Sequence, residues 1–265
     1  MTGSSLYVPP TDSHKGQNGR LLVIGGSRQY HGAPIFSLLA ARRFVDLLYF
    51  FPGDDDEYLL HAVSSIPEVI RLKTIETLPE IDCVLFGIGL GEVKFDSEKL
   101  EATRKVKQTK ENRDMKVTGR KLVIDGDGLK LAKKRIPEGA ILTPHENEFQ
   151  MLFDREGTKE NVKKMAKENN CIILKKGRQD YISDGSQLHV NKTGNEGMTK
   201  GGTGDVLSGL VAALACKNDG FEAAVAGAHI NGFAGDMLFK KFGVNFCASD
   251  VVEMLPMAFR KFVES

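Results

Sequence analysis

Residues 21–26 read LLVIGG, a short apolar run that two glycines bring to an end. Similar runs recur along the chain, separated by longer segments whose apolar residues follow helical spacing. The runs are continuous rather than alternating, which indicates strands buried on both faces of a sheet. Strands that alternate with helices predict a mostly parallel central sheet between helices, an α/β protein with three layers, α/β/α. The other predicted strands are 47–51, 83–91, 121–128, 140–148 and 171–177.

The segments between these strands are expected to be helical, and the last third of the chain is helical almost throughout. YIS and LHV flank Asp184-Gly185-Ser186, which predicts a hairpin. Because no linker, repeat or low-complexity segment interrupts the pattern, we expect one domain over residues 1–265. Ligands of such folds gather beyond the carboxyl ends of the strands. The predicted helices are 33–46, 54–65, 96–115, 205–216, 221–239 and 250–262.

Composition excludes several classes of protein. Lys plus Arg is 36 and Asp plus Glu is 35, so the chain lacks the basic excess that sequence-independent nucleic-acid binding needs. No apolar run approaches the roughly 18 residues of a membrane span, and the first 20 residues contain no secretory signal. Four scattered cysteines without a C-x-x-C pair predict reduced thiols in a cytoplasmic protein.

The strongest local motif is TGNEGMTKGGTGDVLSG, residues 193–209. Its glycines allow backbone N–H groups to approach a ligand, and the helix that follows adds free N–H groups and a positive dipole end. Together these features predict a phosphate-binding turn. The alternative is a glycine-rich helix entry in which Asp205 is only an N-terminal charge or cap. The segment does not match G-x-x-x-x-G-K-[ST], so it is not a Walker A loop.

Asp205 is the natural candidate for a proton acceptor beside that turn. A carboxylate in this position can take the proton of a hydroxyl group that attacks phosphorus. No set of residues with metal-ligand spacing occurs in the sequence, so we expect Mg²⁺ to arrive with the nucleotide.

Other strand ends carry weaker candidates. His145 and Glu148 in TPHENE can reach a ligand over the sheet, or they can start a helix, with Thr143 or His145 as its cap. DGDG places Asp125 and Asp127 at another strand end, where Asp127 can equally start the next helix.

Six motifs in a fixed order resemble one family. They are SHKGQNGRLLVIGGSRQYHGAP, GIGLG, VIDGDGL, LTPHENEF, LKKG and TGNEGMTKGGTGDVLSG. The chain resembles the ADP/ATP-dependent NAD(P)H-hydrate dehydratases of the ribokinase-like superfamily from about Ser13 to its end. The resemblance implies a ribokinase-like fold and an enzyme, a carbon–oxygen lyase. Its reaction would convert the hydrated, 6-hydroxy forms of NADH and NADPH back to NADH and NADPH. ADP or ATP would be consumed to give phosphate plus AMP or ADP.

The resemblance also implies roles for particular residues. Asp205 would deprotonate the ring hydroxyl and contact the hydrate, and Gly204 would lie near both phosphate and nucleotide. Glu148 and Asn195 match motif positions without a specific role. The remaining implied residues are Gly201, Gly202 and Thr203 for phosphate, Lys176, Gly177, Arg178, Gln179 and Asp180 for the nucleotide, and Ala33, Gly89 and His145 for the hydrate.

The sequence departs from the family pattern in four places. Ile88 replaces a usual proline, Asn147 a usual glycine and Asn231 an expected histidine, while DGDGL replaces D-A-D-A-L at residues 125–129. These departures leave the pocket shape and the choice of nucleotide open. Only about a dozen residues precede the match, so we expect no hydrate epimerase activity. The family pattern implies a homo-oligomer, a tetramer.

Two other functions remain open on the sequence. A kinase of the same fold that acts on a hydroxymethylpyrimidine, a thiazole or a sugar would yield a stable phosphorylated product. A non-catalytic adenine-nucleotide sensor would bind nucleotide without turnover.

Overall fold

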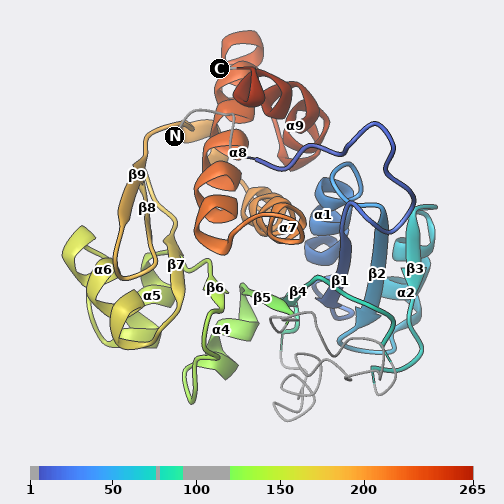
Figure 1. Ribbon diagram of the computed structural model, residues 1–265, viewed down its shortest axis with the longest axis horizontal. Helices are drawn as coiled ribbons and strands as arrows, with labels where there is room; N and C mark the ends of the chain where they lie inside the picture. The colour runs from blue at the N-terminus through green and yellow to red at the C-terminus, as the bar shows by residue number, and fades with distance from the viewer. Residues whose placement is uncertain (1–5, 76–77, 92–119, 265) are drawn as a thin grey trace.

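The computed structural model describes residues 6–75, 78–91 and 120–264, and Figure 1 shows helices on both faces of one central sheet. The strands of the described part are β1 (Arg20–Gly25), β2 (Leu47–Pro52), β3 (Val69–Arg71), β4 (Cys83–Ile88), β5 (Lys121–Ile124), β6 (Ile141–Leu142), β7 (Ile172–Lys175), β8 (Asp180–Ser183) and β9 (Leu188–Asn191). They pair in the order β3-β2-β1-β4-β5-β6-β7-β8-β9.

The sheet is parallel from β3 to β7 and antiparallel from β7 to β9. The predicted mostly parallel sheet is therefore confirmed. The predicted hairpin is β8–β9, and its turn is held by Asp184, whose Oδ1 accepts hydrogen bonds from the N–H groups of Ser186 (2.8 Å) and Gln187 (2.7 Å). Gly185 has φ +90°, a conformation that glycine adopts without strain.

The helices form two layers, because they contribute to two separate apolar cores. One core joins the sheet to α1 (Gly32–Ala41), α2 (Glu57–Ser64), α7 (Thr203–Ala215), α8 (Gly220–Phe242) and α9 (Ala248–Val263). The other joins its opposite face to α4 (Asp127–Ala132), α5 (Glu146–Phe153) and α6 (Lys159–Glu168). The predicted three-layer α/β/α arrangement is confirmed (Figure 1).

Two predicted helices need comment. The helix expected over 33–46 ends at Ala41, because residues 42–46 turn the chain so that β2 can lie beside β1. In that turn the N–H of Asp46 bonds to the carbonyl of Gly19, 3.0 Å away. The helix expected over 96–115 lies outside the described residues.

Helix α7 lies against the middle of the sheet and is buried along most of its length. Gly209 permits a close crossing with α1, since a Cβ atom there would lie 2.4 Å from the backbone oxygen of Ser37. The Ser37 hydroxyl in turn donates a 2.7 Å hydrogen bond to the carbonyl oxygen of Asp205. Helix α1 therefore fixes the position of the first turn of α7.

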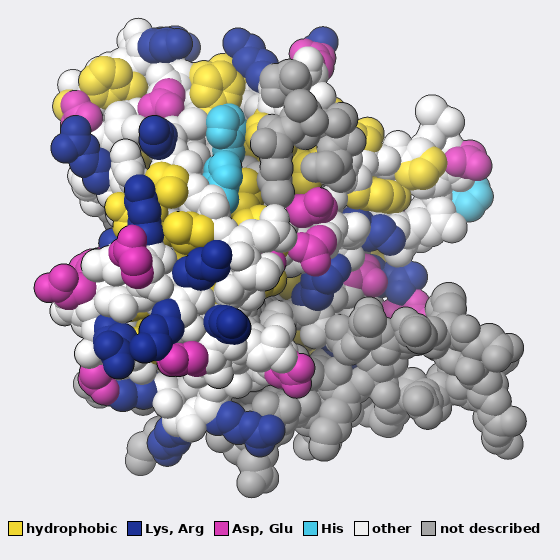
Figure 2. Space-filling view, turned by 60° about the vertical axis from the view of Figure 1, so that its left-hand side comes forward, with side chains coloured by type: hydrophobic (Ala, Val, Ile, Leu, Met, Phe, Trp, Pro, Cys, Tyr) yellow, Lys and Arg dark blue, Asp and Glu magenta, His cyan; other side chains and the backbone are white. Residues whose placement is uncertain are grey.

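The surface carries both signs of charge. Figure 2 shows acidic and basic side chains interspersed over one face.

Cys83, Cys171 and Cys216 are buried free thiols, and Cys247 is an exposed one. Within the described residues, none of the helices has the length and apolar character to cross a membrane.

Candidate active site

The turn before α7 is built so that its backbone lies open at the helix start. Gly202 is the N-cap and has φ +93°, and a Cβ atom there would lie 2.6 Å from the Phe36 ring. Thr203 is buried, and its hydroxyl hydrogen-bonds to the carbonyl oxygens of Met198 (2.7 Å) and Lys200 (2.9 Å). The hydroxyl thus holds the turn in place. The N–H of Thr203 bonds to the carbonyl oxygen of Lys200 at 3.4 Å, whereas the N–H groups of Gly204 and Asp205 have no backbone partner within the described residues and can bind an anion.

Asp205 lies in the first turn of α7 with its carboxyl group largely buried. Burial raises the pKa of this carboxyl group from 3.8 to about 7, and the negative charge of Asp125 adds to the increase. The positive charge of Lys176 opposes both effects. Since Gly202 and not Asp205 is the N-cap, the cap interpretation of Asp205 is wrong. A carboxylate with a pKa near neutrality is well matched to proton transfer.

This pKa predicts a pH dependence. If Asp205 acts as a base, kcat/KM should rise with pH and level off above a midpoint near 7, because kcat/KM follows the ionisation of the free enzyme. The measurement is the steady-state rate across the pH range at low substrate concentration. A profile that remains flat through this midpoint would exclude Asp205 as the titrating group.

Lys176 follows β7 and places its ammonium group between acids. Its Nζ lies 2.9 Å from Oδ1 of Asp125, whose side chain is 5% exposed. Burial lowers the pKa of Lys176, but the carboxylates of Asp125, Glu148 and Asp205 together outweigh it and raise that pKa. A Cβ atom on Gly204 would lie 3.5 Å from the same Nζ. A charged lysine therefore lies against the start of α7, where it can bind phosphate.

His145 and Glu148 form a capping box at the start of α5. The N–H of His145 bonds to the Glu148 carboxylate at 2.8 Å, and the N–H of Glu148 bonds to His145 Nδ1 at 3.2 Å. The helix-start interpretation of TPHENE is therefore confirmed. Glu148 also turns toward Lys176 and Asp125, and burial raises its pKa.

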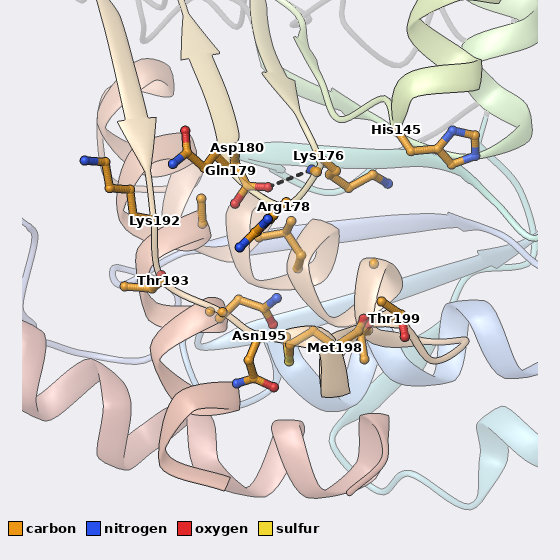
Figure 3. A pocket seen from close by; sticks show the side chains of 18 of the residues that line it. His145, Lys176, Arg178, Gln179, Asp180, Lys192, Thr193, Asn195, Met198 and Thr199 are labelled. Atoms are coloured by element: carbon orange, nitrogen blue, oxygen red, sulfur yellow. Dashed lines mark hydrogen bonds between the residues drawn. The ribbon is translucent and has the colours of Figure 1, made fainter. Parts of the chain in front are cut away.

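A cavity of about 950 Å³ opens beside these groups. It brings His145, Thr203 and Gly204 together with the predicted nucleotide segment 176–180. Figure 3 shows this segment and His145 on one side of the cavity, with Thr193, Asn195 and Met198 facing them. Asp180 stabilises the segment, because its Oδ1 accepts a 3.1 Å hydrogen bond from the N–H of Gly177.

The remaining predicted site residues lie around this cavity rather than on its wall. Gly201, Gly202 and Asp205 belong to the turn and the first turn of α7. Ala33 lies at the start of α1 and Gly89 directly follows β4. The two residues are close, since a Cβ atom on Gly89 (φ +61°) would lie 2.9 Å from the Ala33 Cβ. None of these five is among the described residues that line the cavity.

Several cavity residues were not predicted as site residues. Met198, Leu207, Ala228 and Gly232 lie on its wall, as does Asn231, which the sequence marked only as a departure. One signal was present: Asn231 is a single amide in the otherwise apolar stretch AVAGAHINGFAG. The apolar residues gave no signal, because their pattern is that of any packed helix.

The carboxyl edge of this sheet carries a glycine turn at a helix start, a lysine and an acid. Together with the three layers, this arrangement is that of an α/β protein of the ribokinase-like class. The chain belongs to the NAD(P)H-hydrate dehydratase family, whose model matches residues 21–257. It is 38% identical, over 95% of its length, to the bifunctional NAD(P)H-hydrate repair enzyme Nnr of Archaeoglobus fulgidus, and it spans 53% of that relative.

Two further comparisons cover nearly the whole of a relative. The ADP-dependent (S)-NAD(P)H-hydrate dehydratase of Cenarchaeum symbiosum is 35% identical, with 97% of this chain and 94% of that protein covered. The ADP/ATP-dependent NAD(P)H-hydrate dehydratase of Bacillus subtilis, co-crystallised with ATP/Mg²⁺, superposes with a TM-score of 0.80. That pair is 23% identical, over 98% of this chain and 95% of the other, and supports the shared fold.

Proposed function

We propose that this chain dehydrates the 6-hydroxy forms of NADH and NADPH at the expense of ADP or ATP, a carbon–oxygen lyase reaction. Membership of the family and the activity named for the C. symbiosum relative support the proposal. The observation that carries it is the Asp205 carboxyl group, whose pKa of about 7 suits a base and which lies beside Lys176 and a phosphate-binding turn.

The reaction divides into two steps. Asp205 takes the proton of the ring hydroxyl, whose oxygen forms a bond to the terminal phosphorus as the bond to the departing AMP or ADP breaks. The carbon–oxygen bond then breaks with loss of phosphate, driven by the electron pair of the ring nitrogen. Loss of a proton from the adjacent carbon restores the ring double bond. Hydroxide is a poor leaving group and phosphate a good one, which explains the need for the nucleotide.

Each predicted residue has a place in this scheme. Gly201, Gly202, Thr203 and Gly204 hold the transferred phosphate with backbone N–H groups. Segment 176–180 binds the nucleotide, and Lys176 compensates phosphate charge. Ala33, Gly89, His145 and Asp205 contact the hydrate.

Mg²⁺ fits the site as a companion of the nucleotide. Among the described residues, no group of three or more His, Cys, Asp or Glu side chains could hold a metal ion. Mg²⁺ is commonly held by substrate phosphates with one or two carboxylates, and the acids around Lys176 are candidates for the latter. When bound, the ion would neutralise charge on the phosphates.

The test is a repair assay with two donors. The protein is incubated with hydrated NADPH and either ADP or ATP, and the absorbance of reduced nicotinamide is followed. We expect absorbance to return with at least one donor and inorganic phosphate to accumulate in equal amount. No return, together with a stable phosphorylated thiazole or pyrimidine when these are supplied, would replace the proposal with a kinase. Nucleotide binding without any turnover would replace it with a sensor.

The single-domain boundaries, the tetramer and the cytoplasmic location stay predictions. Light scattering of the purified chain measures the oligomeric state directly.

A further inference from the structure

Asn231 on α8 is a buried polar residue whose side-chain oxygen is unsatisfied within the described part of the chain. Its side chain lies on the cavity wall, yet the residue is only 6% exposed. In the described part of the chain its Oδ1 atom has no hydrogen-bond partner. An unsatisfied buried amide is destabilising, so its presence at a cavity calls for a physical reason.

Three polar side chains of residues 191–195, the segment that lies against α8, are engaged. The Asn191 amide donates to Asp180 (2.9 Å) and to the carbonyl of Ala228 (3.2 Å). The Thr193 hydroxyl bonds to the carbonyl of His229 at 3.0 Å. The Asn195 amide donates to Asp236 at 3.0 Å. These side chains have partners, whereas Oδ1 of Asn231 is buried and has none among the described residues.

Small and apolar residues line the cavity together with this amide. Ala228, Asn231 and Gly232 share one face of α8, and Leu207 and Met198 line the same cavity. Gly232 lets the strand-to-helix connection approach α8, since a Cβ atom there would lie 2.4 Å from the Thr193 hydroxyl oxygen. Apolar walls with one unsatisfied amide suit a flat heteroaromatic ring with polar atoms on its edge. The charged groups, Lys176 and the start of α7, suit phosphates instead.

We propose that the Asn231 side-chain amide binds the edge of adenine formed by its 6-amino group and ring nitrogen N7, and so makes the donor site select adenine. This rests on the proposed nucleotide-dependent function. Oδ1 accepts from the amino group while Nδ2 donates to N7, a geometry that asparagine also uses to recognise adenine in nucleic acids. Guanine and hypoxanthine present two acceptors on this edge. Either orientation of the amide then leaves Oδ1 against another acceptor.

The test compares nucleotide affinities of the wild type and Asn231→Leu. Calorimetry is run with ADP, GDP, IDP and the diphosphate of 7-deazaadenosine. We expect the wild type to bind ADP about 10-fold or more tightly than the other three, the range of one bidentate contact. In Asn231→Leu the four affinities should converge, through a loss for ADP rather than a gain for the others. Pyrophosphate affinity should be equal in both proteins.

Asn218→Leu is the matched control. Asn218 is equally buried but satisfied: its Oδ1 accepts from the N–H of Tyr7 at 2.7 Å and its Nδ2 donates to the carbonyl of Leu214 at 2.8 Å. This variant should lose thermal stability and keep the preference for ADP. Asn231→Leu should keep its Tm in the absence of nucleotide, because it removes an amide that has no partner to lose.

The outcomes separate the two proposals. An unchanged preference for ADP in Asn231→Leu overturns the role of Asn231 and leaves the repair activity standing. A wild type that selects ADP through Asn231 but repairs no hydrate overturns the repair activity and leaves the role of Asn231 standing. A wild type that binds all four nucleotides equally also overturns the role of Asn231.

Discussion

Asp205→Asn should lower kcat for hydrate repair by about 100-fold or more, the range expected when a general base is removed. Asparagine has nearly the same shape, and the backbone carbonyl that Ser37 binds is unchanged, so the helix start stays in place. Nucleotide affinity should therefore fall little. The measurement is single-turnover repair combined with calorimetric titration of ADP.

The same variant should also be more resistant to heat than the wild type. The folded protein holds the Asp205 proton more tightly than the unfolded chain does, because the pKa rises from 3.8 to about 7. The free energy of unfolding of the wild type therefore decreases as pH rises from 3.8 to about 7. Asparagine does not ionise, so the variant does not lose this stability. Glu253→Gln, at an exposed ion pair with Arg43, is the control and should change neither property. Unimpaired turnover in Asp205→Asn would disprove its role as the base.

Gly209→Ala should destabilise the protein and impair catalysis together. The added methyl group would meet the backbone of α1, with Ser37 oxygen 2.4 Å and Ser37 Cα 2.6 Å from the new Cβ. Overpacking of this kind costs about 1–3 kcal/mol, and because backbone cannot rotate away we expect the upper part of that range. Thermal denaturation should show a Tm lower by several degrees. Because α1 also holds the Asp205 carbonyl, kcat should fall as well.

Gly32→Ala is the matched control for this change. Gly32 is likewise helical, but a Cβ atom there would have no neighbour within 4 Å. Alanine has the higher helix propensity, so this variant should be as stable as the wild type or slightly more stable. Equal Tm values for the two variants would show that α1 and α7 do not depend on the close crossing at Gly209.

The layered fold was predictable because its strands are continuous apolar runs that only burial on both faces explains. For α5 only a possible start in TPHENE was predicted, and α6 was not among the helices that were given bounds. The α5 segment was read as part of a strand with a polar end, and α6 is the charged stretch KENVKKMAKE, whose buried residues are Val162, Met165 and Ala166. Three apolar residues in a charged segment give a weak periodic signal. The end of α1 could not be predicted, because it depends on the pairing of β2 with β1 and no local sequence pattern encodes that pairing.

The residues of the candidate site were likewise predicted only in part. A glycine turn before a helix leaves a visible pattern, so Asp205 and the turn at Gly202 were predicted from the residues, and Lys176 was predicted from the family resemblance. The ion pair of Lys176 with Asp125 joins residues 51 positions apart, and only the fold brings them together. The wall formed by α8 was missed because a residue beside a ligand and a residue in a core are equally apolar.

The position of α7 has a consequence for synthesis of the chain. Leu85 of β4 and Val123 of β5 belong to the core that α7, α8 and α9 close, and all three helices come from the last third of the sequence. While the nascent chain emerges from the ribosome, α1 and α2 are the first helices of this core to form, and β4 and β5 lack the cover of α7 until residue 215 has been added. We therefore expect chaperones that bind exposed apolar segments to recognise the first half of the polypeptide, and folding of the sheet to be completed only after α7 has been synthesised.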